Sequence, residues 1–195
     1  MNSKYGPWAL VIGGSEGIGR ALVEKLAAQG INVAFTARKA APLEETAVAV
    51  RRAFPGIQVR TLSQDITAPD MMAKIGAFTQ DLDVGLLIYN AGAMNRVPEF
   101  LDDTIEGHLH TIRLNCEGPT RLCHHFGRKM RERGQGGIML MSSVSALIGS
   151  WGTAVYGGTK AFDLILCESL WYELKSHNID VLCLVVGGTA SHLNS

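Results

Sequence analysis

The residues best suited to chemistry are a tyrosine and a lysine four positions apart, Tyr156 and Lys160. Residues i and i+4 share one face of a helix, so the phenol and the ammonium can converge on one site. Free tyrosine, with a pKa of about 10, is a poor base at neutral pH, but a nearby cation stabilises the phenolate. Tyr156 could therefore protonate the oxygen of a carbonyl during reduction and deprotonate an alcohol during oxidation.

A serine thirteen residues before the tyrosine is the candidate partner. Ser143 follows the apolar run Gly137–Met141, which is predicted to be a strand. Ligands bind at the carboxyl ends of strands in open α/β sheets, so Ser143 could hydrogen-bond a substrate oxygen and orient it. Ser142 and Ser145 compete for this role, because the assignment depends on spacing alone.

A glycine-rich turn precedes the first predicted helix. Gly13 would allow a tight turn, Gly17 would let backbone approach a pyrophosphate, and Gly19 would let the helix pack closely on the sheet. The helix N-terminus would offer free N–H groups and a partial positive charge to the phosphates. A plain glycine-rich turn is the alternative. The predicted cofactor contacts here are Gly13, Ser15, Glu16, Gly17, Ile18 and Gly19.

Strands and helices are predicted to alternate along the chain. The predicted strands are Trp8–Ile12, Ile31–Thr36, Ile57–Leu62, Val84–Tyr89, Gly137–Met141 and Ile179–Val186. The predicted helices are Gly17–Gln29, Pro42–Ala53, Ala68–Gln80, Asp102–Arg133 with a break near Gly118–Pro119, and Thr153–Ser176. Short continuous apolar runs are typical of strands covered on both faces. The sequence therefore predicts an α/β fold of Rossmann type, a doubly wound parallel sheet in three layers with about six strands, and residues 1–195 as one dinucleotide-binding domain.

Composition excludes several other classes. The 195 residues are 47% hydrophobic and 18% charged, with 18 basic and 18 acidic residues. This balance argues against a nucleic-acid partner, and no apolar run is long enough to cross a membrane. The four cysteines form no CxxC pair and no secretory signal is present, so we expect a cytoplasmic protein. The closely spaced histidines, His108 with His110 and His124 with His125, do not share a helix face, so no metal site is predicted.

The spacing G-x-x-x-G-x-G, followed by the tyrosine and lysine, resembles the short-chain dehydrogenase/reductase family over nearly the whole chain. Asp65 with Ile66 resembles the family's acidic position near adenine, and Asn90-Ala91-Gly92 resembles its N-N-A-G segment, with Tyr89 in place of the first Asn. Taken singly, Asp65 could be a turn or cap residue and Asn90 a loop residue. Asn115 lies where the family keeps an Asn, although it could also be a satisfied buried polar group.

The resemblance implies a catalytic set and a hydride-transfer reaction. The catalytic residues would be Ser143, Tyr156, Lys160 and Asn115, with the Asn anchoring a proton-relay water. Tyr156 and Lys160 would also contact the cofactor, the lysine through the nicotinamide ribose. Gly187 and Thr189 would contact the nicotinamide carboxamide, in a segment where Val186 replaces the usual Pro. Ile12 takes the place of a Thr that braces the turn, which implies a modest structural cost.

Arg38 is the residue that favours NADP over NAD. Enzymes that choose NAD usually place an acidic residue at the end of the second strand, where this chain has Ala37. The Arg38 guanidinium could bind a 2′-phosphate and stack on adenine, although a solvated loop cation is the alternative. Glu16 argues the other way, because a carboxylate near a phosphate is unfavourable. NADP is therefore predicted, with NAD possible.

Two functions from different classes follow. The first is an oxidoreductase that transfers a hydride between NADP(H) and a small-molecule carbonyl or secondary alcohol. The second is a nucleotide-binding module with weak or no turnover, because relatives usually continue for roughly 50 residues that close the active site. The resemblance also implies a homo-oligomer, paired through the helices Asp102–Arg133 and Thr153–Ser176.

Overall fold

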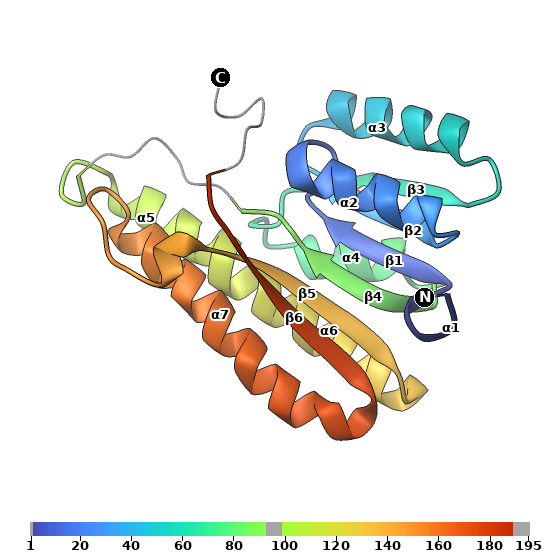
Figure 1. Cartoon of the computed structure of the whole chain (residues 1–195). Helices are drawn as coiled ribbons and strands as arrows, with labels where there is room; N and C mark the ends of the chain where they lie inside the picture. The colour runs from blue at the N-terminus through green and yellow to red at the C-terminus, as the bar shows by residue number, and fades with distance from the viewer. Residues whose placement is uncertain (1, 93–98, 189–195) are drawn as a thin grey trace.

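A computed structural model describes residues 2–92 and 99–188, and it contains a six-stranded parallel sheet (Figure 1). The strand order is β3-β2-β1-β4-β5-β6, so the order reverses beside β1. The strands are β1 Trp8–Ile12, β2 Asn32–Ala37, β3 Val59–Ser63, β4 Val84–Tyr89, β5 Gly136–Ser143 and β6 Ile179–Val186. The predicted α/β class and doubly wound sheet are confirmed.

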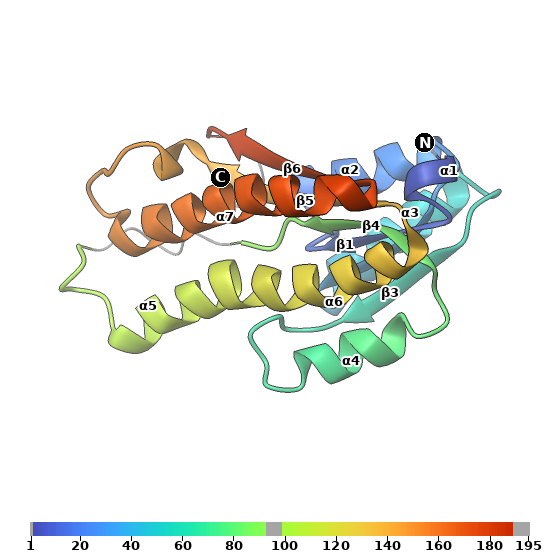
Figure 2. The same ribbon diagram turned by 90° about the horizontal axis from the view of Figure 1, so that it is seen from below.

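Helices cover both faces of the sheet (Figures 1 and 2). The helices are α1 Asn2–Tyr5, α2 Gly17–Ala28, α3 Ala40–Ala53, α4 Met71–Phe78, α5 Ile105–Ile112, α6 Gly118–Arg133 and α7 Ala154–Leu174. On one face, the side chains of Ala9 and Val11 share a hydrophobic core with residues of α2 and α3. On the other face, Leu10 and Ile12 share a second hydrophobic core with residues of α4, α6 and α7. Alternate residues of β1 thus belong to two hydrophobic cores, which gives three layers.

The sheet is not covered evenly. Every residue of β1 is buried, as the continuous apolar run predicts. Strand β6 instead alternates, with Ile179 and Val181 buried and Leu182 and Val185 exposed. The expectation of strands covered on both faces is therefore wrong for β6, whose main helical contact among the described residues is with α7.

The long helical segment before β5 contains the largest local departure from the sequence prediction. Residues Arg113–Glu117 form a π-helix between α5 and α6, so the irregularity begins five residues before the expected break at Gly118–Pro119. The hydroxyl of Thr104 caps α5 by accepting the N–H of Gly107 at 3.0 Å. A π-helix widens one turn and frequently marks a functional site, and this one contains Asn115.

Candidate active site

The glycine-rich turn connects β1 to α2 as predicted. Gly13 adopts φ +83, a region that side chains rarely enter, and its N–H and that of Gly14 donate to the carbonyl of Thr36 at 2.9 and 3.0 Å. A Cβ on Gly19 would overlap the carbonyl oxygen of Gly13, so only glycine lets α2 start so close to the strand. Asn90 adds a bond from Nδ2 to the same oxygen at 2.8 Å.

A further brace of the turn was missed at the sequence level. The buried hydroxyl of Thr46 on α3 donates to the carbonyl of Ser15 at 2.8 Å. Ile12, which takes the family's Thr position, is fully buried in the core. The hydroxyl that supports the turn therefore comes from another helix, and sequence spacing gave no sign of it.

A cleft opens at the carboxyl ends of β1, β2 and β4, where the strand order reverses. Eight of the predicted cofactor residues line it: Gly13, Ser15, Glu16, Arg38, Ile66, Asn90, Ala91 and Gly92. Five further lining residues were not predicted: Thr36, Ala37, Lys39, Gln64 and Leu114. Open α/β sheets bind ligands at this topological position.

The remaining predicted cofactor residues lie beside the cleft or elsewhere. Gly17, Ile18 and Gly19 form the first turn of α2, directly after the lining residues of the turn. Gly187 follows the end of β6 and is exposed. Thr189 lies outside the described residues.

Asp65 shapes a turn next to the cleft. Its Oδ1 accepts from the backbone N–H and the hydroxyl of Thr67, both at 2.8 Å. Burial raises the pKa of Asp65, but the Thr67 bonds and the charges of Arg38 and His110 outweigh this, so the pKa lies below its usual value. The carboxylate is thus a turn residue, as its alternative interpretation held, and its contact with adenine stays a prediction.

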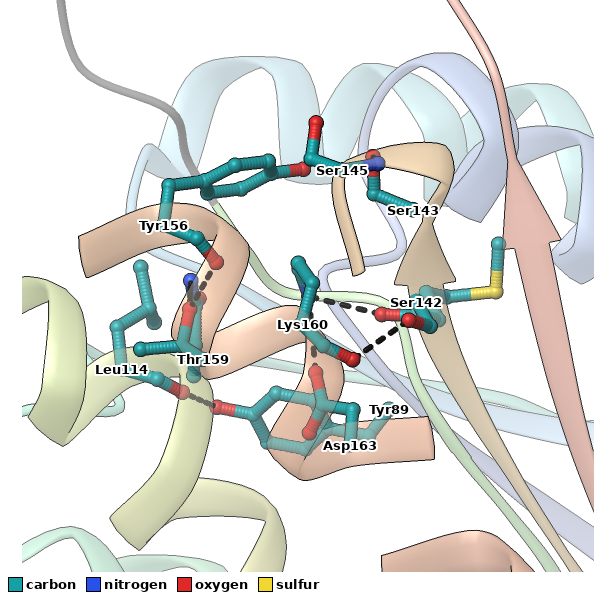
Figure 3. Close-up of polar contacts among 11 residues, drawn as sticks. Tyr89, Leu114, Ser142, Ser143, Ser145, Tyr156, Thr159, Lys160 and Asp163 are labelled. Carbon is teal, nitrogen blue, oxygen red and sulfur yellow. Dashed lines mark hydrogen bonds and ion pairs between the residues drawn. The ribbon is translucent and has the colours of Figure 1, made fainter. Parts of the chain in front are cut away.

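Tyr156 and Ser143 meet at the junction of β5 and α7. Strand β5 ends at Ser143, and Tyr156 lies in the first turn of α7. Figure 3 shows the phenol ring extending over the segment that carries Ser143 and Ser145. The Ser143 hydroxyl accepts the N–H of Ser145 at 3.2 Å, which fixes the oxygen at the end of the strand.

The structure removes one of the three competing serines. The hydroxyl of Ser142 is buried and donates to the backbone carbonyl of Lys160 at 2.7 Å. It therefore joins β5 to α7 and is not available to a substrate. Ser143 and Ser145 remain on the side of Tyr156 (Figure 3).

Lys160 makes an ion pair that the sequence analysis missed. Its Nζ donates to the carbonyl of Met141 at 2.8 Å and to Oδ2 of Asp163 at 3.0 Å, and it lies 6.0 Å from the Tyr156 ring centroid. The side chains of Lys160 and Asp163 are only 6% and 3% exposed. Burial raises the pKa of Asp163 to about 6, although Lys160 acts in the opposite direction. An acidic residue at position i+3 in an otherwise apolar helix segment, Ala161–Cys167, was the available signal.

Asn115 faces the same space as the lysine. Its Nδ2 donates to the Thr159 hydroxyl at 2.9 Å, while the buried Oδ1 has no hydrogen-bond partner among the described residues. A Cβ on Gly92 would lie 3.5 Å from this Oδ1 and 3.3 Å from Nζ of Lys160. An unpaired buried oxygen beside a buried ammonium fits a water or a ligand hydroxyl.

Tyr89 explains how the π-helix is held. Its buried hydroxyl donates to the carbonyl of Leu114 at 2.5 Å, the residue before Asn115 (Figure 3). Burial raises the pKa of Tyr89 well above its usual value, so the phenol remains a donor. The side chain that replaces the family's Asn therefore supports the backbone that presents Asn115.

The residues present fit a dinucleotide. The glycine-rich turn lets a pyrophosphate come close to the backbone at the N-terminus of α2. The cleft continues past Asn90 to Gly92, and the unpaired Oδ1 of Asn115 lies beyond it. Within the described part of the chain, no group of three or more His, Cys, Asp or Glu side chains is arranged to hold a metal ion. No helix in the same residues combines the length and apolar character needed to span a membrane.

Comparison with known proteins agrees with this arrangement. Residues 7–195 match the family model of the short chain dehydrogenases. The chain is 31% identical to a 7β-hydroxysteroid dehydrogenase of Clostridium sardiniense, over 97% of this chain and 72% of that protein.

Two solved structures have the same fold. One, from a study of 7β-hydroxysteroid dehydrogenase stereoselectivity, is 28% identical with a TM-score of 0.93 and covers 99% of this chain and 74% of that one. The other is a short-chain dehydrogenase from Sphingobium yanoikuyae in complex with NADPH, 32% identical with a TM-score of 0.89, covering 95% of this chain and 72% of that one.

Proposed function

The chain belongs to the short-chain dehydrogenases, a family of oxidoreductases, and we propose that it transfers a hydride between NADP(H) and a carbonyl or secondary alcohol. The observation that supports this best is the grouping of Tyr156, Ser143 and Lys160 at the end of β5, beside a cleft that fits a dinucleotide. When bound, the nicotinamide ring supplies or accepts the hydride.

Each residue of the site then has a defined task. The hydroxyl of Ser143 donates to the substrate oxygen and orients it. The phenol of Tyr156 gives its proton to that oxygen in reduction and takes one in oxidation. The ammonium of Lys160 stabilises the phenolate and uses its remaining N–H to bind the cofactor ribose. Oδ1 of Asn115 holds a water through which Tyr156 regains its proton.

An assay with matched variants tests the reaction. Purified protein is incubated with NADPH and a panel of ketones, aldehydes and quinones, and NADPH oxidation is followed by absorbance. Tyr156→Phe should lower kcat by about 10²–10⁴-fold, the usual contribution of a general acid. Tyr172→Phe is the matched control, since Tyr172 lies on the same helix and is 75% exposed. Tight NADPH binding with no turnover of any panel member would favour the nucleotide-binding module.

Arg38 supports the proposed preference for NADP. It lines the cleft together with Lys39, so two cations are available to a 2′-phosphate. A related structure contains NADPH. Glu16 lines the same cleft and opposes this preference. We expect Arg38→Ala to weaken NADPH binding by about 10- to 100-fold, the value of one or two charge-assisted hydrogen bonds, and to leave NADH nearly unchanged. Tighter binding of NADH than NADPH to the unaltered protein would contradict it.

A bulky apolar ketone is the proposed kind of substrate. The segment between β5 and Tyr156 exposes Val144, Leu147, Ile148 and Trp151, the last at 71%. Exposed apolar side chains beside a polar site favour a substrate with a large apolar body. The relative from Clostridium sardiniense acts, by its name, on a hydroxysteroid. The panel should therefore include 7-oxo steroids beside small ketones, and a preference for the small ketones would contradict this proposal.

A homo-oligomer is proposed through α5 and α7, which contact each other. Apolar side chains remain exposed on both helices: Ile105, Leu109, Ile112, Phe162 and Ile165. Such a patch is typical of a protein interface. Light scattering should give a dimer or larger, and Ile165→Glu should lower the mass to that of the monomer.

We also propose that residues 1–195 act as one domain in a reducing, cytoplasmic setting, which the free thiols of all four cysteines support.

A further inference from the structure

We propose that Asp163 is a positioning residue that holds the ammonium of Lys160 in place and offsets its charge. The inference rests on the proposed function, because it takes Lys160 and Tyr156 as the acting groups. Its basis is the buried contact of 3.0 Å between Oδ2 of Asp163 and Nζ of Lys160 (Figure 3).

The hydrogen bonds of Lys160 define its position. An ammonium has three N–H donors, and two of them are used by the carbonyl of Met141 at 2.8 Å and by Asp163. The two acceptors come from β5 and α7, so they fix Nζ between the strand and the helix. One N–H is left for the phenol, a water or a cofactor hydroxyl near Gly92.

Asp163 is an unusual residue for its location. It is 2% exposed, and its Oδ1 has no hydrogen-bond partner among the described residues. A buried carboxylate is costly unless it is paired. Its one charged partner in the described part of the chain is Lys160, a residue of the reacting site, and this is the contact expected of a group that acts on the lysine.

The surroundings of Asp163 identify the groups that could also respond to pH. Those that interact with it electrostatically are Lys160 and Cys167 on α7, Tyr89 on β4, Cys116 on the π-helix, Cys123 on α6 and Cys183 on β6. Burial raises the pKa of Cys116 to about 11 and of Cys123 to about 12. A hydrogen bond with Cys167 lowers the pKa of Cys183, so that thiol needs a control.

Asp163 should therefore hold the Lys160 ammonium differently above and below about pH 6, because burial raises the pKa of Asp163 to about 6. Above this pH the carboxylate accepts a charge-assisted hydrogen bond and holds Nζ firmly. Below it the neutral acid holds Nζ more weakly. Asp163→Asn should therefore behave at every pH as the unaltered protein does at low pH.

The experiment compares unaltered protein, Asp163→Asn and two controls between pH 5 and pH 8. Glu168→Gln removes an exposed carboxylate from the same helix, and Cys183→Ser removes the competing thiol. Two readouts are taken: kcat for the best ketone of the panel, and the dissociation constant of NADPH from its fluorescence. Each readout is expressed as the ratio of the variant to the unaltered protein, because ionisation of the cofactor phosphates affects both proteins alike.

We expect Asp163→Asn to lower kcat about tenfold at pH 8, with little change in KM, in line with the loss of one charge-assisted hydrogen bond. The ratio should approach one at pH 5, and the NADPH ratio should show the same inflection near pH 6. Both controls should give flat ratios. Two results would overturn the inference. One is a ratio for Asp163→Asn that does not change with pH, and the other is a ratio for Cys183→Ser that shows the inflection near pH 6.

Two outcomes separate this inference from the proposed reaction. If no ketone is turned over but the NADPH ratio inflects, the positioning role stands and the proposed reaction fails. If turnover is present and Asp163→Asn matches the unaltered protein at every pH, the reaction stands and the positioning role fails. Should Asp163→Asn not fold, the unaltered protein decides, because kcat without an inflection near pH 6 contradicts the inference.

Discussion

Asp163 should give the free energy of unfolding a pH dependence opposite to that of an ordinary surface carboxylate. Burial raises the folded-state pKa of Asp163 from 3.8 to about 6, so the folded protein takes up a proton more readily than the unfolded chain. The resulting stabilisation is complete below pH 3.8 and is lost as the pH rises through about 6. Asp180 is the contrast: hydrogen bonds from Lys4 and Tyr5 lower its pKa, so its stabilisation is lost as the pH falls.

The size of the effect follows from the two pKa values of Asp163. One pH unit between folded and unfolded values corresponds to ~1.4 kcal/mol, so the separation from 3.8 to about 6 corresponds to about 3 kcal/mol. Between about pH 4.5 and 7.5, the practical range for the measurement, the stabilisation from Asp163 should fall by roughly 2 kcal/mol. Asp163→Asn cannot titrate, so its free energy of unfolding relative to the unaltered protein should rise by that amount across the range.

Urea denaturation followed by circular dichroism at several pH values measures this difference. Glu168→Gln serves as the control, since Glu168 is exposed on the same helix. The comparison removes the contributions of all other carboxylates, because they titrate alike in both proteins. The assignment of the raised pKa to Asp163 would be refuted if the free energy of unfolding of Asp163→Asn, relative to the unaltered protein, stayed constant or fell as the pH rises.

Three further substitutions test the site and its support. Gly19→Ala should destabilise the protein by about 2 kcal/mol or more and abolish NADPH binding, because the added Cβ would overlap the Gly13 carbonyl. Gly76→Ala is the control: a Cβ at Gly76 would meet no atom within 4 Å, so this variant should raise the melting temperature slightly. Tyr89→Phe should cost about 1 kcal/mol in urea denaturation, since it removes the bond to the π-helix. Tyr156→Phe should leave the melting temperature unchanged while kcat falls, and a lowered melting temperature would point to a structural role.

Most of the fold could be predicted from local patterns. Strands β1, β4 and β6 have the bounds that their apolar runs indicate, and β5 reaches Ser143, as its proposed role requires. These features depend on residues close together in the chain, which hydrophobic periodicity and turn chemistry report well. The short helix α1 was missed, because four residues are too few for a periodic pattern.

The π-helix and the brace of the turn could not be predicted in the same way. Both depend on contacts between residues distant in sequence, Tyr89 with Leu114 and Thr46 with Ser15. Tyr89 was recognised only as a replacement for an expected Asn. Its structural role depends on which helix packs over β4, and a single sequence does not provide that information.

The ion pair of Lys160 changes the electrostatic argument made from sequence. Spacing alone treats Lys160 as a cation that stabilises the phenolate of Tyr156, and the structure places a carboxylate against that cation. The net charge near the phenol then depends on the ionisation of Asp163, whose pKa of about 6 lies close to physiological pH. A neutral Asp163 leaves the charge of Lys160 fully available to the phenol but holds its position less firmly. Precision of placement and strength of charge therefore oppose each other at this site, and the tenfold fall in kcat expected of Asp163→Asn at pH 8 requires placement to have the larger effect on turnover.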